Sequence, residues 1–95
     1  MFRNMIINYS TFKDKSLEEL LETFPSKLKT GKYVSRFMIH KTRQNKGWRV
    51  GYFGKSLSYI KENSNLKMAV MVLLTSLING GLLKLTDDFK LVQND

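Results

Sequence analysis

Cysteine is absent from this 95-residue sequence, and acidic residues are scarce. Without cysteine the chain can form neither a disulfide framework nor a thiolate zinc site, which fits a reducing compartment. His40 is the single histidine, so a histidine-rich metal site is excluded as well. The 8 acidic residues are opposed by 16 lysines and arginines, giving a formal net charge of +8. An excess this large destabilises a small domain through self-repulsion, so it favours a polyanionic partner.

Long hydrophobic runs are also missing. The longest is Met68–Leu74, and even when extended to Ile78 it is far shorter than the ~20 residues that a transmembrane helix needs. Met1–Tyr9 lacks the apolar core and the small-residue cleavage site of a signal peptide. We therefore expect no membrane partner and a cytoplasmic location.

No group of residues has the spacing of a catalytic or metal site. His40 has no acid near it in sequence, and no serine lies in a G-x-S-x-G motif. Gly54-Lys55-Ser56 is similar to the end of a phosphate-binding loop, but Arg49 stands where that loop needs its first glycine. The sequence thus predicts a protein that is not an enzyme and that uses no cofactor or metal.

The N-terminal third predicts one strand and one helix. Apolar residues partly alternate with asparagine in Met1–Tyr9, which indicates a strand. Ser16-Leu17-Glu18-Glu19 has the pattern of a capping box, and Pro25 ends the helix because the residue before a proline avoids the α region. We expect a helix over about 16–24, followed by a polar basic connector over Ser26–Lys32.

A β-hairpin over about 33–54 is predicted at the centre of the chain. Aromatic and β-branched residues are concentrated before and after the turn-forming segment Gln44–Gly47. If Asn45–Gly47 forms a three-residue loop, Arg43 faces Arg49 and His40 faces Tyr52. A two-residue loop would move every partner by one position.

The remaining third predicts a helix and short strands. Ser56–Ser64 could either prolong the second strand of the hairpin or form an irregular link. Ser64 or Asn65 can cap a helix over about 65–79, which Gly80 and Gly81 would end. Short strands are expected at Leu82–Leu85 and Phe89–Val92. The predicted fold is a single α+β domain over 1–95 in the order β-α-β-β-α-β, with room for one more strand, in which an antiparallel sheet packs on the two helices.

The positive charge is concentrated in a stretch without acids. After Glu22 the next acidic residue is Glu62, so the cations between them create a positive field instead of local ion pairs. Such a field attracts phosphates, and exposed aromatic rings can stack on unpaired bases. Arg43 and Arg49 lie nearest the predicted hairpin tip. The residues expected to bind nucleic acid are Lys27, Lys29, Lys32, Arg36, Lys41, Arg43, Lys46, Arg49 and Lys55, with Trp48 and Tyr52 as stacking rings. The alternative is a solvated basic face with no ligand, since lysines also protect sheet edges.

The predicted second helix is apolar on nearly all sides, so nearly all of it must be covered. It could be a central core helix inside the monomer, or part of it could contact a second copy of the chain or another partner. Met68, Met71 and Val72 are the residues expected at such an interface, because methionine adapts to irregular contacts.

Two resemblances bear on function. The run Leu-Ile-Asn-Gly-Gly-Leu-Leu-Lys-Leu-Thr-Asp-Asp-Phe-Lys-Leu-Val, which starts at Leu77, resembles the end of a winged-helix domain, although Leu66–Ile78 lacks the polar face of a recognition helix. The Ser-led helix, the strand Gly47–Phe53 and the Ala-bearing helix together resemble small α/β-sandwich accessory proteins of bacteriophages. That resemblance implies that the protein originates from a mobile element. It also implies that the protein inhibits a host nucleic-acid machine, which would place it in the host cytoplasm.

Three functions follow as hypotheses. The first is a basic protein that binds RNA, DNA or a nucleoprotein complex. The second is an interaction or inhibitor module that acts on an acidic protein surface. The third is an oligomer, such as a homodimer, that sequesters a small anionic nucleotide between subunits.

Overall fold

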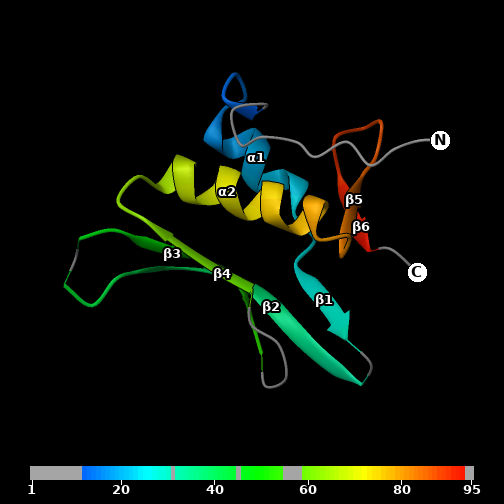
Figure 1. Cartoon of the computed structure of the whole chain (residues 1–95), viewed down its shortest axis with the longest axis horizontal. Helices are drawn as coiled ribbons and strands as arrows, with labels where there is room; N and C mark the ends of the chain where they lie inside the picture. Colours follow the sequence, from blue (N-terminus) through cyan, green and yellow to red (C-terminus); the bar gives the residue numbers. More distant parts are fainter. Residues whose placement is uncertain (1–11, 31, 45, 55–58, 94–95) are drawn as a thin grey trace.

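The computed structural model describes residues 12–30, 32–44, 46–54 and 59–93 (Figure 1). The strand expected at Met1–Tyr9 and the cation Lys55 lie outside these ranges. The elements, in chain order, are α1 (Leu17–Thr23), β1 (Lys27–Thr30), β2 (Tyr33–Lys41), β3 (Trp48–Phe53), β4 (Tyr59–Asn63), α2 (Leu66–Asn79), β5 (Leu83–Leu85) and β6 (Leu91–Gln93). The predicted α+β class is confirmed, and within the described ranges the chain has strands that the sequence did not predict. No described helix is long and apolar enough to cross a membrane.

Both helices begin at the caps that the sequence indicates. The Ser16 Oγ accepts a hydrogen bond from the Glu19 amide at 3.1 Å, and the Ser16 amide donates to the Glu19 carboxylate at 2.9 Å. The hydrogen bond from the Ser16 amide lowers the pKa of Glu19 because it stabilises the charged form. Of the two possible caps for α2, Asn65 is used, and its side chain accepts from the Met68 amide at 2.9 Å. Gly81 ends that helix with φ of 79°, a conformation that glycine adopts without strain.

Strands β1 to β4 form one antiparallel sheet in chain order. The expectation that Ser26–Lys32 is a connector was wrong, because Leu28 is buried between two exposed lysines and the segment alternates like an edge strand. The ambiguous segment after β3 contains a separate strand, β4, which pairs with β3 instead of prolonging it. Its first residues, 56–58, lie outside the described ranges.

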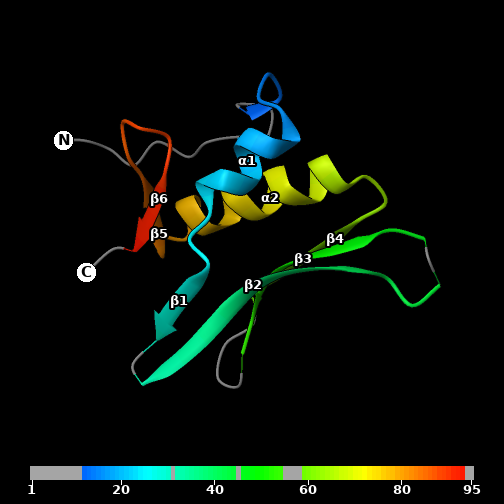
Figure 2. The same ribbon diagram turned by 180° about the vertical axis from the view of Figure 1, so that it is seen from behind.

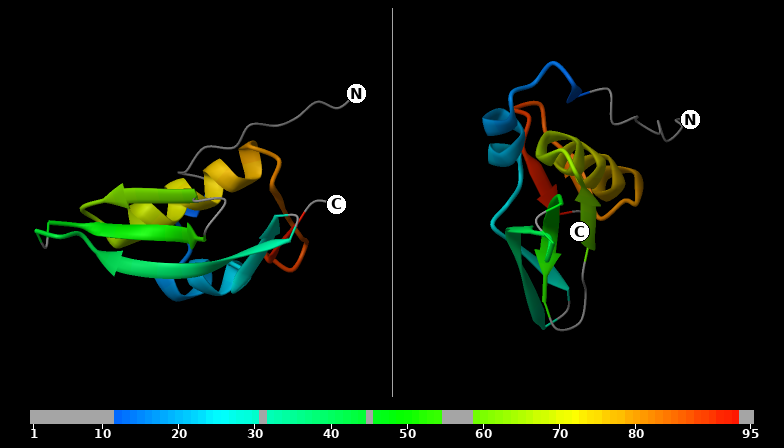
Figure 3. Two further views of the ribbon diagram at one scale, coloured as in Figure 1. Left: turned by 90° about the horizontal axis from the view of Figure 1, so that it is seen from below. Right: turned by 90° about the vertical axis from the view of Figure 1, so that its left-hand side faces the viewer.

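Helix α2 covers one side of this sheet at β3 and β4, and α1 packs against α2 on the same side of the sheet (Figures 1 and 2). Seen from below, the strands curve beneath the helices (Figure 3). Because α2 has the sheet on one side and α1 on another, six of its residues are buried: Ala69, Val70, Met71, Leu73, Leu74 and Leu77. The interpretation of α2 as a core helix therefore accounts for most of its apolar surface.

The expected interface residues of α2 separate into two groups. Met71 is only 5% exposed and belongs to the core, which corrects the expectation that it offers an adaptable contact to a partner. Met68 and Val72 are half-buried, and Met68 packs against the core. The helix alone therefore presents no broad apolar stripe to a second copy.

Tyr52 joins the sheet to the end of α1. Its side chain is completely buried, and its hydroxyl donates to the Pro25 carbonyl at 2.6 Å. Phe37 and Phe24 pack around it, with ring centroids 5.3 and 6.4 Å away. Burial raises the pKa of Tyr52 well above its ordinary value, because the charged phenolate would lose its hydration there.

The C-terminal hairpin β5–β6 forms a separate two-stranded sheet that lies beside the end of α2 (Figure 1). The Gln93 side chain accepts from the Lys29 amide at 2.9 Å and donates to the Lys29 carbonyl at 2.8 Å. These two bonds occupy backbone groups on the outer edge of β1 that would otherwise be open to a foreign strand.

Candidate nucleic-acid interface

The register of β2 and β3 determines which cations meet at the hairpin tip. His40 pairs with Arg49 and Lys41 with Trp48, so the pairing of the two strands ends at Lys41 and Trp48. The Thr42 amide donates to the Gly47 carbonyl at 3.0 Å and closes the loop. Neither the three-residue loop nor the two-residue alternative is formed, so Arg43 does not pair with Arg49, nor His40 with Tyr52.

The physical reason for this register is the burial of β3 under α2. Val50 and Tyr52 are completely buried, and they pair across the sheet with Ile39 and Phe37. Paired residues of an antiparallel sheet share a face, so this register places all four apolar side chains on the side of the helix. The tight three-residue loop would have moved them out of that alignment.

The opposite side of β1–β4, here called the outer sheet face, carries the residues that alternate with the buried ones. The ladder assigns to it Lys27, Lys29, Val34, Arg36, Met38, His40, Arg49, Gly51, Phe53, Ile60 and Glu62. Four of them are lysine or arginine, and Glu62 is the acidic residue of the set. The sheet thus separates an apolar, helix-covered side from a basic side.

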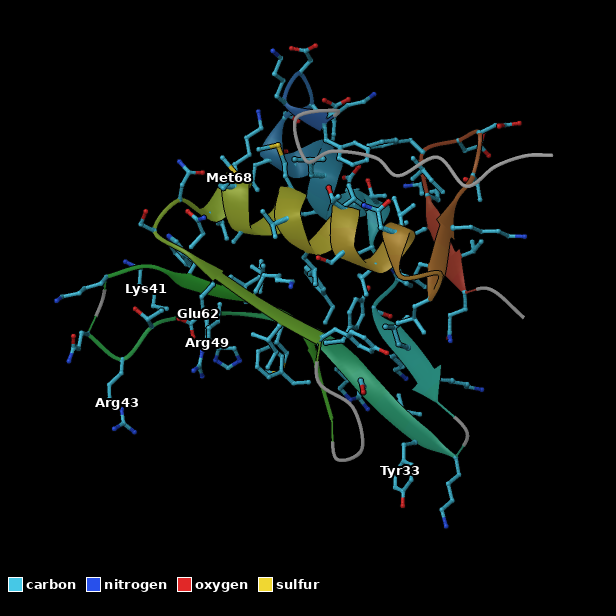
Figure 4. All side chains as sticks on the ribbon, viewed as in Figure 1. Tyr33, Lys41, Arg43, Arg49, Glu62 and Met68 are labelled. Carbon is cyan, nitrogen blue, oxygen red and sulfur yellow. The ribbon has the colours of Figure 1, made fainter. Side chains whose placement is uncertain are left out.

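At the hairpin end this face contains a hollow of about 890 Å³, here called the tip hollow. Its lining includes Lys41, Arg43, Lys46 and Arg49, which come from β2, the loop and β3. All four are exposed. Figure 4 shows Arg43 projecting from the loop, while Arg49 lies on the sheet next to Glu62. Arg43, Lys46 and Arg49 therefore meet at one concave surface, whereas the Lys41 side chain lies over the Trp48 ring on the other side of the sheet.

One of these cations has an acidic partner that sequence reasoning did not identify. The Arg49 Nε and the Glu62 Oε2 are 2.6 Å apart, and both side chains are 52% exposed. Arg49 and Glu62 are also directly paired across β3 and β4. An ion pair this exposed contributes only ~0–1 kcal/mol, so a phosphate can compete with Glu62 for the guanidinium. Because sequence reasoning did not predict β4 as a separate strand, it could not identify Glu62 as a neighbour of Arg49.

The two expected stacking residues differ in accessibility. Tyr52 lies in the core, which corrects its assignment as a stacking ring. Trp48 is half-buried, and the Lys41 Nζ lies 5.0 Å from the centre of its indole, so its ring faces a cation.

An aromatic pair that was not predicted lies on the outer sheet face. The rings of His40 and Phe53 are 5.0 Å apart at an interplanar angle of 59°, and both residues line the tip hollow. They approach each other diagonally on either side of Gly51, which has no side chain to separate them. A Cβ at Gly51 would also collide with the backbone of Tyr59 and Ile60. In the sequence, the glycine at position 51 within a predicted strand was the feature that could have indicated this close contact.

The remaining predicted cations lie toward the other end of the sheet. Lys27 pairs directly with Arg36, and both are exposed, as are Lys29 and Lys32. Tyr33 marks this end in Figure 4, far along β2 from the loop that carries Arg43. The cations of the acid-free stretch between Glu22 and Glu62 are therefore divided between the hairpin tip and the β1–β2 end of the sheet.

Comparison of the chain with family models, curated proteins and solved structures gives no match. Within the described ranges, no group of three or more histidine, aspartate or glutamate side chains could hold a metal ion. Function is therefore inferred from the charge and geometry of the tip hollow.

Proposed function

We propose that this protein is a non-enzymatic binding protein that holds nucleic acid at the tip hollow. The observation that carries the proposal is the convergence of Arg43, Lys46 and Arg49 around one concave surface whose acidic lining residue is Glu62. Like charges held this close repel one another, and a bound polyanion relieves the repulsion. The basic residues at the β1–β2 end would extend the same field along the sheet.

The proposal predicts binding that weakens as salt rises. Each phosphate neutralised releases condensed counterions, so log K falls with log[salt] by about 0.9 per contact for duplex DNA and about 0.7 for a single strand. Three cations in the tip hollow would give a slope that is readily measured by fluorescence anisotropy with a labelled oligonucleotide. We expect clear binding at ~50 mM salt and much weaker binding at ~200 mM.

A paired substitution tests whether the tip hollow is the site. The double variant Arg43→Gln, Lys46→Gln should lower the magnitude of the salt slope by about 1 to 2, as each lost contact removes roughly one counterion. The control is Lys13→Gln, Lys84→Gln, which makes the same change in net charge at exposed positions outside the β2–β3 hairpin. Equal weakening by both pairs would reject the tip hollow, and absence of binding at ~50 mM salt would reject nucleic acid altogether.

The other two hypotheses predict different outcomes of the same experiment. An inhibitor of an acidic protein surface, as the resemblance to phage accessory proteins implies, would bind an acidic polypeptide more tightly than any oligonucleotide. A protein that sequesters a small nucleotide would be saturated by a mononucleotide, which would then displace the oligonucleotide at comparable concentration. The extended row of cations favours a polymer over a mononucleotide, because one phosphate group can meet only part of it.

A further inference from the structure

The outer sheet face carries apolar surface as well as charge. Met38 and Val34 are 42% and 43% exposed, although large apolar side chains in a small domain are usually buried. His40 is the next outward residue after Met38 on β2 and is also exposed, and its ring packs against that of Phe53. A surface that served only to attract phosphates would have no use for these groups.

Apolar and cationic side chains alternate on this face. Along β2 the outward residues are Arg36, Met38 and His40. Across the ladder, Arg36 pairs with Phe53 and His40 pairs with Arg49. Each ring of the His40–Phe53 pair therefore has an arginine directly opposite it on the neighbouring strand. The face thus offers flat apolar surfaces at its centre with guanidinium groups on both sides.

We infer that the nucleic acid bound by this protein is single-stranded and lies across the outer sheet face, with an unpaired base stacked on the His40 ring. Phe53 supports that ring from its other side, and Arg36 and Arg49 contact the flanking phosphates. This inference rests on the proposed function and adds to it the class of nucleic acid and the stacking residue.

Base stacking is the interaction by which this surface would distinguish a single strand from a duplex. In a duplex the base faces are covered by their neighbours, so a ring on a sheet can meet only the backbone or the groove edges. In a single strand the bases can turn outward and stack on aromatic side chains, as they do on the sheets of several RNA-binding domains. The alternation of rings and arginines matches the alternation of bases and phosphates along one strand.

The test compares a labelled 12-nucleotide oligo(dT) with a DNA hairpin duplex of equal phosphate number, using fluorescence anisotropy at fixed low salt. We expect tighter binding of oligo(dT). His40→Ala should weaken its binding by about fivefold or more, because stacking on one base is lost, and should leave duplex binding nearly unchanged. His40→Phe keeps a flat ring and should restore the affinity.

Tyr33→Ala is the matched control, since it removes an exposed ring from the same strand on the opposite side of the ladder. It should leave oligo(dT) binding unchanged. Equal affinity for both DNAs, together with no effect of His40→Ala, would overturn the inference. The proposed function would survive that result if Arg43→Gln, Lys46→Gln still lowered the salt slope. Tighter binding of poly-glutamate than of oligo(dT) would overturn both proposals in favour of an acidic protein partner.

Discussion

Removing the hydroxyl of Tyr52 tests how the sheet is fastened to the first helix. Tyr52→Phe keeps the ring that packs on Phe37 and removes only the hydrogen bond to the Pro25 carbonyl. A buried hydrogen bond contributes ~0.5–1.5 kcal/mol net, and water can reach the half-buried Pro25, so the expected loss is ~1 kcal/mol. For a domain of this size that loss lowers the Tm by about 4–8 °C.

The same residue predicts a dependence on alkaline pH. Burial holds the pKa of Tyr52 above the value of ~10 that it has in the unfolded chain. The unfolded state therefore releases a proton above pH ~10 while the folded state keeps its own, so folding stability is full below that pH and falls as pH rises. Tyr52→Phe has no such proton, so its deficit relative to the unsubstituted protein should shrink above pH ~10.

The assay is urea unfolding followed by circular dichroism at pH 7, 9 and 10.5, with Tyr33→Phe as the control. Tyr33 is exposed, so its hydroxyl should matter little at any of these pH values. The reasoning fails if Tyr52→Phe is as stable as the unsubstituted protein at pH 7. It also fails if the deficit stays constant up to pH 10.5.

Three further substitutions have defined outcomes. Ser16→Ala removes the helix cap of α1 and should cost ~1 kcal/mol in urea unfolding, whereas an unchanged midpoint would show that the cap is dispensable. Gly51→Ala forces a Cβ against the backbone of Tyr59 and should unfold the domain or cost ~3 kcal/mol, so a normal circular dichroism spectrum and midpoint would contradict the register. Glu62→Gln frees Arg49 from its ion pair and should tighten nucleic-acid binding in anisotropy while changing stability by less than ~1 kcal/mol. Weaker binding by that variant would mean that Glu62 orients Arg49 for the ligand.

Signals that act over a few residues determined the helices. The Ser16–Glu19 exchange, the stop at Pro25 and the glycine after α2 each depend on side chain and backbone within one helical turn. For this reason the sequence alone located α1 to within a residue at each end and α2 with its C-terminal end correct. The existence of the central hairpin followed in the same way from its turn residues and the strand-forming residues around them.

Only the tertiary structure decided how the strands pair and which charges meet. Lys27–Thr30 and Tyr59–Asn63 are too short for a clear pattern, and they become strands because a neighbouring strand completes their hydrogen bonds. Composition favoured a basic binding surface, but the side of the sheet that α2 covers decided that Tyr52 is buried and His40 exposed. The register between β3 and β4 places Glu62 beside Arg49, and a strand's register depends on contacts between residues far apart in the chain.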